Sequence, residues 1–162
     1  MKVMKRRPIP LLWLVLGLLM LCNLGWVVRP GDWKPTRRSD ELSYTIFSYR
    51  QWQSVGLKME TGDQYTLRAT GEWAYSPLVG LHGPAGGLPS VDTYPLPGHR
   101  GGALLGRIGE NGQPFYVGAR VSGYATTPGL LYLRINDDLL GDNQGEMLVA
   151  VDIIRAEVTP SP

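Results

Sequence analysis

The residues best suited to chemistry lie in a loop at positions 136–145, between two apolar segments. The loop contains carboxylates, amides and glycines: Asn136, Asp137, Asp138, Gly141, Asp142, Asn143, Gln144 and Gly145. A hard cation such as Ca²⁺ takes six to eight oxygen ligands of these kinds. The spacing is not that of an EF-hand, whose ligands alternate before a glycine. Since Asp, Asn and Gly are also common in turns, this composition leaves two interpretations open, a calcium-binding loop and a plain hairpin loop.

No recognisable catalytic pattern accompanies this loop. Four carboxylates are candidates for a glycosidase pair, but no spacing favours any two of them: Glu72, Asp92, Glu110 and Asp137. The sequence contains no GxSxG, HExxH or P-loop motif, and its glycine-rich segment at residues 106–112 follows no βαβ pattern. We therefore expect a protein that is not an enzyme.

The elements that must position the loop are predicted to be strands. In residues 64–70, Tyr65, Leu67 and Ala69 alternate with polar residues, which is the period of a half-buried strand. Similar segments occur at residues 43–48, 54–60, 102–108, 115–117, 131–136 and 147–154. The Asn111-Gly112 pair marks a tight turn between two of them. About seven or eight short strands predict an all-β fold, an antiparallel β-sandwich.

A long segment at residues 76–100 separates two of these predicted strands. It carries five prolines and five glycines, so we expect a loop without regular structure, and such loops are often functional. Its polar and aromatic side chains include His82, Asp92, Tyr94 and His99. A sugar site uses such groups, because an aromatic face covers the apolar side of the ring while ring hydroxyls coordinate the ion. An incidental surface histidine is the alternative for His82 and His99.

The N-terminal region is predicted to cross a membrane. Residues 1–8 are basic, and residues 9–28 form an apolar segment long enough to span a bilayer as a helix. The exit at Trp26-Val27-Val28 is a poor cleavage site, and Leu21 before Cys22 does not fit a lipoprotein signal. We expect an uncleaved signal-anchor with residues 1–8 in the cytoplasm. Residues 29–40 then form a linker, residues 41–158 an extracytoplasmic domain and residues 159–162 a tail.

Composition excludes other classes of protein. Cys22 is the only cysteine, so no intrachain disulfide can form and no zinc-finger spacing exists. Half of the 16 basic residues lie within the first 38 positions, which leaves the remainder of the chain acidic. An acidic domain is not expected to bind nucleic acid.

Several motifs, in order along the chain, resemble a known family. They are residues 69–75 (ATGEWAY), 82–84 (HGP), 102–109 (GALLGRIG), 131–137 (LYLRIND) and 142–145 (DNQG). Together they resemble the calcium-dependent, galactose-specific bacterial lectins of the galactophilic PA-I type, over residues 55–153. The resemblance implies a jelly-roll-like β-sandwich, like a galactose-binding domain, in which Ca²⁺ bridges the protein and two sugar hydroxyls.

The resemblance also implies a set of site residues. Asp137, Asp142 and Asn143 correspond to the side-chain ligands of the ion, with Asp142 at a position where the family usually has Asn. Backbone carbonyls near Tyr75 and Leu140 complete the implied set. The sugar-contacting segment differs from that of the family, so His82, Asp92, Tyr94 and His99 are candidates for sugar contacts here.

Two functional hypotheses follow. The first is a single-pass membrane protein whose extracytoplasmic domain binds a galactose-like glycan through Ca²⁺. The second is an accessory or structural subunit of a membrane protein complex that has the lectin-like fold without binding sugar, since fold does not determine function. A weaker third possibility is a non-catalytic module of a secreted glycan-degrading system.

Overall fold

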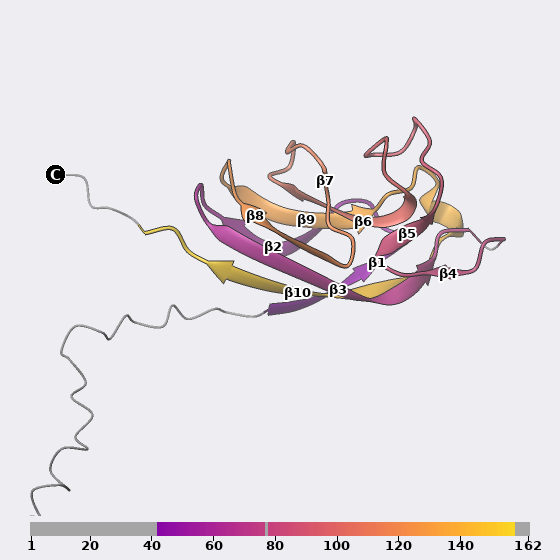
Figure 1. Ribbon diagram of the computed structural model, residues 1–162, viewed down its shortest axis with the longest axis horizontal. Coiled ribbons are helices and arrows are strands. Elements are labelled where there is room, and N and C mark those ends of the chain that lie inside the picture. Colours follow the sequence, from indigo (N-terminus) through magenta and orange to yellow (C-terminus); the bar gives the residue numbers. More distant parts are fainter. Residues whose placement is uncertain (1–41, 77, 158–162) are drawn as a thin grey trace, which may run out of the picture. The chain divides into compact units, whose positions relative to one another are not determined.

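The computed structural model describes residues 42–76 and 78–157, which form two antiparallel sheets in two layers (Figure 1). The first sheet contains β1 (Leu42–Phe47), β10 (Gln144–Ile154), β3 (Gln64–Ala74), β4 (Leu81–His82) and β8 (Arg120–Tyr124). The second contains β2 (Gln53–Met59), β9 (Gly129–Ile135), β6 (Gly101–Ile108), β5 (Ala85–Leu88) and β7 (Phe115–Tyr116). The predicted all-β antiparallel fold is confirmed.

The register of the central strands decides which loops meet. β10 pairs with β3 along its whole length, from Gln144 opposite Ala74 to Ile154 opposite Gln64. In the second sheet β9 pairs with β6, with Ile135 opposite Leu104. Because both pairs are antiparallel, the end of β9, the start of β10, the end of β3 and the start of β6 all lie at one end of the sandwich. We call the loop at residues 136–145, which is predicted to bind an ion, the ion loop, and this end of the sandwich the ion-loop end.

The core lies between the two sheets. In β10, Met147, Val149 and Val151 are fully buried while Leu148 is 52% exposed, so this central strand has one open face. Trp73 of β3 is also fully buried, and its indole Nε1 donates a hydrogen bond of 2.7 Å to the carbonyl of Gly102 in the opposite sheet. A buried indole needs such an acceptor, and this bond therefore joins the two sheets at the ion-loop end.

Three short strands differ from the sequence-based expectation. Residues 76–100 are not free of regular structure, because β4 pairs with the end of β3 and β5 pairs with β6. β8 pairs with the first half of β3, with Val121 opposite Leu67. Such short strands, one with the sequence AGGL, carry little signal of their own. They form because a long neighbouring strand offers free backbone groups.

The predicted membrane-spanning segment, residues 9–28, lies outside the described residues. So do the predicted N-terminus at residues 1–8, the linker at residues 29–40 and the tail at residues 159–162. Among residues 42–76 and 78–157, no helix is long and apolar enough to cross a bilayer.

Candidate functional site

The loop between β9 and β10 turns its polar side chains inward. It contains a single turn of 3-10 helix, Leu140–Asp142. Asn136, Asp137 and Asn143 are at most 4% exposed, whereas Leu139 is 64% exposed. A simple solvent-facing hairpin turn has the opposite arrangement, since polar groups are buried only where partners satisfy them. The loop therefore differs from a plain solvent-facing hairpin, and ion binding there stays a prediction.

Asp137 is a buried carboxylate that interacts electrostatically with Arg134 but forms no salt bridge with it. Its Oδ2 accepts a hydrogen bond of 2.9 Å from Asn143 Nδ2, and its Oδ1 accepts one of 3.3 Å from the Leu139 N–H. No basic side chain in the described ranges forms a salt bridge with it. Burial raises the pKa of Asp137 above its ordinary value, although these hydrogen bonds act in the opposite direction. Asp137 therefore has no direct ion pair among the described residues, and burial outweighs the hydrogen bonds that stabilise its charged form.

Two neighbouring acceptor oxygens are buried and have no partner. Asn143 donates through Nδ2 both to Asp137 and to the carbonyl of Ser48, at 3.1 Å, so its Oδ1 points away from both. That Oδ1 and Asp142 Oδ1 are buried and accept no hydrogen bond. Leaving such an acceptor unsatisfied costs about 1–3 kcal/mol. A bound cation removes this cost, because it uses the same oxygens as ligands.

The backbone carbonyls predicted as ligands, near Tyr75 and at Leu140, differ in whether they already accept a hydrogen bond. The carbonyl of Leu140 accepts a 3.4 Å hydrogen bond from the Asn143 N–H, and the carbonyl of Ser76 accepts one of 3.3 Å from Val79. No donor among the described residues reaches the carbonyl of Tyr75, which directly follows β3. These residues contain no group of three or more His, Cys, Asp or Glu side chains placed to hold a metal. The candidate ligand set therefore needs amide and backbone oxygens besides its two carboxylates.

Arg134 supports the ion loop, and the sequence motifs did not single it out. Its side chain is buried, and it donates from Nη2 to the carbonyl of Asp137 at 2.6 Å and from Nε to the carbonyl of Ile135 at 2.9 Å. Nη1 donates to Gln51 Oε1 at 2.8 Å, and the guanidinium lies 5.5 Å from the ring centre of Trp52. The planar guanidinium group thus fixes the backbone at Asp137, the first candidate ligand. Strand periodicity alone does not show that the Arg134 side chain is buried, because its burial depends on tertiary packing.

Asn136 connects the long segment at residues 76–100 to the ion loop. Its Oδ1 accepts a hydrogen bond of 3.0 Å from the Leu96 N–H. Its Nδ2 donates to the carbonyls of Leu96, His99 and Arg100 at 3.2–3.3 Å. Thr93 also donates from its hydroxyl to the carboxylate of Asp138. The structure therefore places the predicted sugar-contacting segment beside the ion loop, as the sugar-site hypothesis requires.

Two of the four predicted sugar-contacting residues lie close to the centre of this end. Tyr94 covers Gly101, and burial raises its pKa, with Asp137 and Asp138 adding to the effect. His82 packs against Tyr75 with ring centres 5.7 Å apart, and its Nε2 is buried without a partner. Burial, with the charge of Asp137 and the proximity of Tyr94, raises the pKa of Tyr75 to about 12. Tyr75, Tyr94 and Asp137 are thus electrostatic neighbours.

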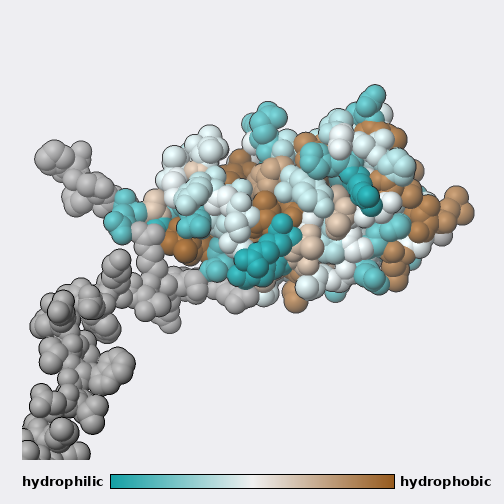
Figure 2. Space-filling view, in the orientation of Figure 1, coloured by the Kyte–Doolittle hydropathy of each residue, from teal (hydrophilic) through white to brown (hydrophobic). Residues whose placement is uncertain are grey.

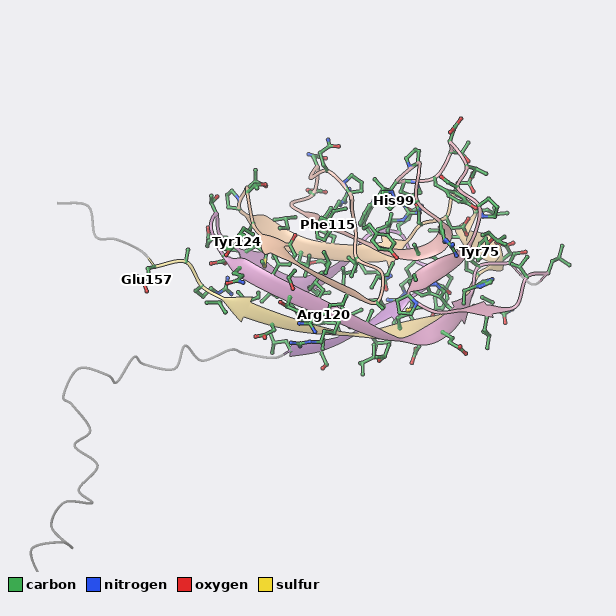
Figure 3. All side chains as sticks on the ribbon, in the orientation of Figure 1. Tyr75, His99, Phe115, Arg120, Tyr124 and Glu157 are labelled. Carbon is green, nitrogen blue, oxygen red and sulfur yellow. The ribbon has the colours of Figure 1, made fainter. Side chains whose placement is uncertain are left out.

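The other two predicted residues are placed differently. His99 stacks on Tyr116 of β7, with ring centres 5.2 Å apart, and its Nδ1 is buried without a partner. Figure 3 shows His99 on the upper layer, away from Tyr75 at the ion-loop end. Asp92 is exposed and makes no hydrogen bond or ion pair with the described residues. These side chains do not belong to the cluster around Asp137 that His82 and Tyr94 form with Tyr75.

Comparison with known proteins supports the fold. No protein-family model matches the chain, and no curated protein matches it. Among solved structures, the chain is similar to one described as "EclA N-terminal domain; PllA-like lectin". The TM-score is 0.57 at 22% sequence identity, and the match covers 69% of this chain and 95% of that one. The chain therefore has a lectin-like β-fold, while calcium dependence and galactose specificity remain predictions.

Proposed function

We propose that this protein binds carbohydrate, and that it does so through Ca²⁺ held in the ion loop. The observation that carries the proposal is the pair of buried, unpartnered oxygens in this loop, Asp142 Oδ1 and Asn143 Oδ1, together with the buried carboxylate of Asp137, which bonds to Asn143 and forms no salt bridge. Three such groups in one loop suit a calcium ion, which takes oxygen ligands and whose positive charge balances the carboxylates. The lectin-like fold and the sequence motifs agree with this function.

The residues of the chain divide into ligands and supports. Asp137, Asp142 and Asn143 would hold the ion by their side chains, and Tyr75 and Leu140 by their carbonyls. Arg134 and Ser48 orient this set, since Arg134 holds the Asp137 backbone and the carbonyl of Ser48 fixes the Asn143 amide. Removal of an outer group of this kind typically lowers metal affinity by roughly 10- to 100-fold. When bound, Ca²⁺ would supply a positive centre to which vicinal sugar hydroxyls coordinate.

A galactose-like glycan is the proposed ligand, on the strength of the sequence resemblance. His82 and Tyr94 are the side chains best placed to contact it, because both lie against the Tyr75 and Asp137 cluster. Asp142 adds a carboxylate where the resembling family has an amide. The extra negative charge should strengthen ion binding. The sugar specificity has to be measured.

A glycan array read in calcium and in chelator tests this function. We expect the full chain to bind galactose-terminated glycans in calcium and to lose them in chelator. Asp142→Ala should lose binding in both conditions, since it removes one of the unpartnered oxygens. Glu146→Ala is the matched control, because Glu146 is an exposed carboxylate of β10 whose side chain makes no hydrogen bond or ion pair with the described residues. Binding that is equal in calcium and chelator would contradict the proposal.

Exposed apolar side chains at the same end favour a second candidate function. Leu78 is 93% exposed, Leu81 63% and Leu139 64%. Figure 2 shows hydrophobic residues gathered at the end of the molecule where β4 lies. Such a patch often marks a protein contact, as expected for an accessory subunit of a membrane complex. A stoichiometric protein complex that survives purification, from a chain with no signal on the glycan array, would support the subunit function instead.

The proposed location is the outer side of a membrane, with residues 9–28 as a single-pass anchor. The support is the apolar length of that segment. Protease added to intact cells should remove the domain while leaving a short membrane-bound fragment. Resistance of the domain in intact cells, with cleavage after lysis, would place it inside.

A further inference from the structure

A hollow of about 340 Å³ lies at the end of the sandwich opposite the ion loop. It is lined by residues of the β6–β7 and β8–β9 loops, and by Tyr65 near the start of β3. Tyr75 of the candidate ion site directly follows the other end of the same strand. Ten residues of strand at ~3.3 Å each separate the two places by roughly 33 Å. The hollow is therefore distinct from the ion loop, and its size is within the range of small-molecule sites.

One wall of the hollow is aromatic. Tyr124, at the end of β8, is 65% exposed, and Phe115 packs on Tyr65 with ring centres 5.8 Å apart. Figure 3 shows Phe115 and Tyr124 well away from Tyr75. The Tyr65 hydroxyl packs over Gly123, where a Cβ would lie only 2.8 Å from it. Exposed tyrosine faces cover the apolar side of a ligand while their hydroxyl groups remain in contact with water.

The hollow also offers unused hydrogen-bonding groups. The side chains of Asn111, Gln113 and Thr127 make no hydrogen bond within the described residues, and neither does the Tyr65 hydroxyl. The described lining contains amides, hydroxyls and aromatic rings but no charged side chain. A charged ligand would find no counter-charge there, whereas a neutral ligand with many hydroxyl groups and one apolar face would match this lining.

We propose that this hollow is a second carbohydrate-binding site, independent of calcium, that takes a neutral sugar unit. The sugar ring lies against Tyr124, and its hydroxyls bond to Asn111, Gln113 and Thr127. The site does not depend on the ion loop, because no carboxylate contributes to its described lining. Two sites at opposite ends make the domain bivalent, and at this separation they link two glycan chains rather than bind one disaccharide. Avidity on a dense glycan surface follows from that geometry.

Amide NMR on the full chain tests the proposal, in a detergent without a sugar headgroup and in EDTA. The probes are galactose, glucose, mannose and N-acetylglucosamine. We expect at least one of them to shift the amides of residues 111–113 and 124–127 in a saturable way. Tyr124→Ala should weaken that binding about tenfold, as removal of an aromatic anchor does. Leu148→Ala is the control, since Leu148 is also exposed but lies on β10 outside the hollow.

The result that would overturn this proposal differs from the result that would show that the ion loop binds no calcium. Absence of shifts at residues 111–113 and 124–127 with all four sugars would overturn it. Binding that persists in Tyr124→Ala, or that disappears in EDTA or in Asp137→Asn, would do the same. Binding at this hollow by a chain whose ion loop takes up no calcium would support the second site and contradict only the calcium-dependent function.

Discussion

Two buried aspartates, one at each end of the sandwich, have opposite electrostatic environments. Asp63, just before β3, accepts hydrogen bonds of 2.9 Å from the N–H groups of Glu60 and Ala156, and one of 2.6 Å from Arg155. Burial alone would raise its pKa, but these donors and the Arg155 charge outweigh burial, and the pKa of Asp63 is lowered. Asp137 has weaker compensation, and burial raises its pKa.

The difference distinguishes a structural carboxylate from one suited to a ligand. Asp63 satisfies its charge within the fold, so it has no further need of a cation. Asp137 is as deeply buried, at 4% exposure against 1% for Asp63, but it lacks a salt bridge, and Asn143, which bonds to it, carries an unpartnered oxygen. Burial of a carboxylate is therefore not itself a sign of function. A buried carboxylate suggests a functional site when the surrounding residues do not fully compensate the cost of burying its charge.

Removing the Asp63 carboxylate should have the largest effect on stability. In Asp63→Ala the N–H groups of Glu60 and Ala156 lose their acceptor. We expect a loss of about 3 kcal/mol in the free energy of unfolding, equal with and without calcium. Urea denaturation of the full chain in both conditions measures it. A loss that calcium restores would make Asp63 part of an ion site and remove the contrast with Asp137.

The next largest effect is expected from Asp137→Asn, and it should depend on the ion. At a calcium concentration 100 times the Kd, the wild-type chain should gain about 2.7 kcal/mol of stability, and this variant should gain almost none. Without calcium the variant should be at least as stable as wild type, because it removes an uncompensated buried charge. Thermal unfolding with calcium and with chelator checks both statements. A large loss of stability in chelator would mean that Asp137 is structural, like Asp63.

A smaller effect is expected from Arg155→Met. Arg155 is 53% exposed, so its ion pair with Asp63 is partly screened by solvent. We expect a loss of about 1 kcal/mol or less, reduced further in high salt. Denaturation at low and high ionic strength measures it. A loss as large as that of Asp63→Ala would assign the stabilisation to the ion pair rather than to the two backbone hydrogen bonds.

The pH dependence should separate the two aspartates by sign. The pKa of Asp63 is lowered, so its contribution to stability is present above its unfolded pKa, about 3.8, and is lost as the pH falls through the lower folded value. The pKa of Asp137 is raised, so its contribution is present below 3.8 and is lost as the pH rises through the higher folded value. Urea denaturation between acid and neutral pH in calcium-free buffer, on wild type, Asp63→Asn and Asp137→Asn, resolves each difference. If the stability of wild type relative to each variant changed in the same direction with pH, the contrast between Asp63 and Asp137 would be contradicted.

Much of the fold could be predicted from local pattern. The alternation of Tyr65, Leu67 and Ala69 places β3, and the same period places most other long strands. β4, β5 and β8 could not be predicted in this way, because their short segments become strands only beside β3 or β6. The membrane segment at residues 9–28 is a sequence prediction that lies outside the described residues.

The candidate site could be predicted only in part. The composition of the loop and the family motifs pointed to Asp137, Asp142 and Asn143, and the structure buries unpartnered oxygens of Asp142 and Asn143 in this loop. The motifs contained Arg134 without indicating a role for it and did not include Ser48, because the contacts of both residues with the loop depend on tertiary packing. Nor did they separate His82 and Tyr94 from His99 and Asp92.

The sequence by itself determined the strand-forming segments and the oxygen-rich chemistry of one loop, because side-chain period and residue type are local properties. Only the tertiary structure decided which of the two buried carboxylates has its charge compensated by hydrogen bonds and an ion pair. Asp63 obtains its donors from residues as distant in sequence as Arg155 and Ala156. For Asp137, the neighbouring Arg134 bonds to the backbone carbonyl and interacts with the carboxylate electrostatically, but it forms no salt bridge with it. Charge compensation depends on which chain segments meet, and antiparallel register rather than local sequence fixes that.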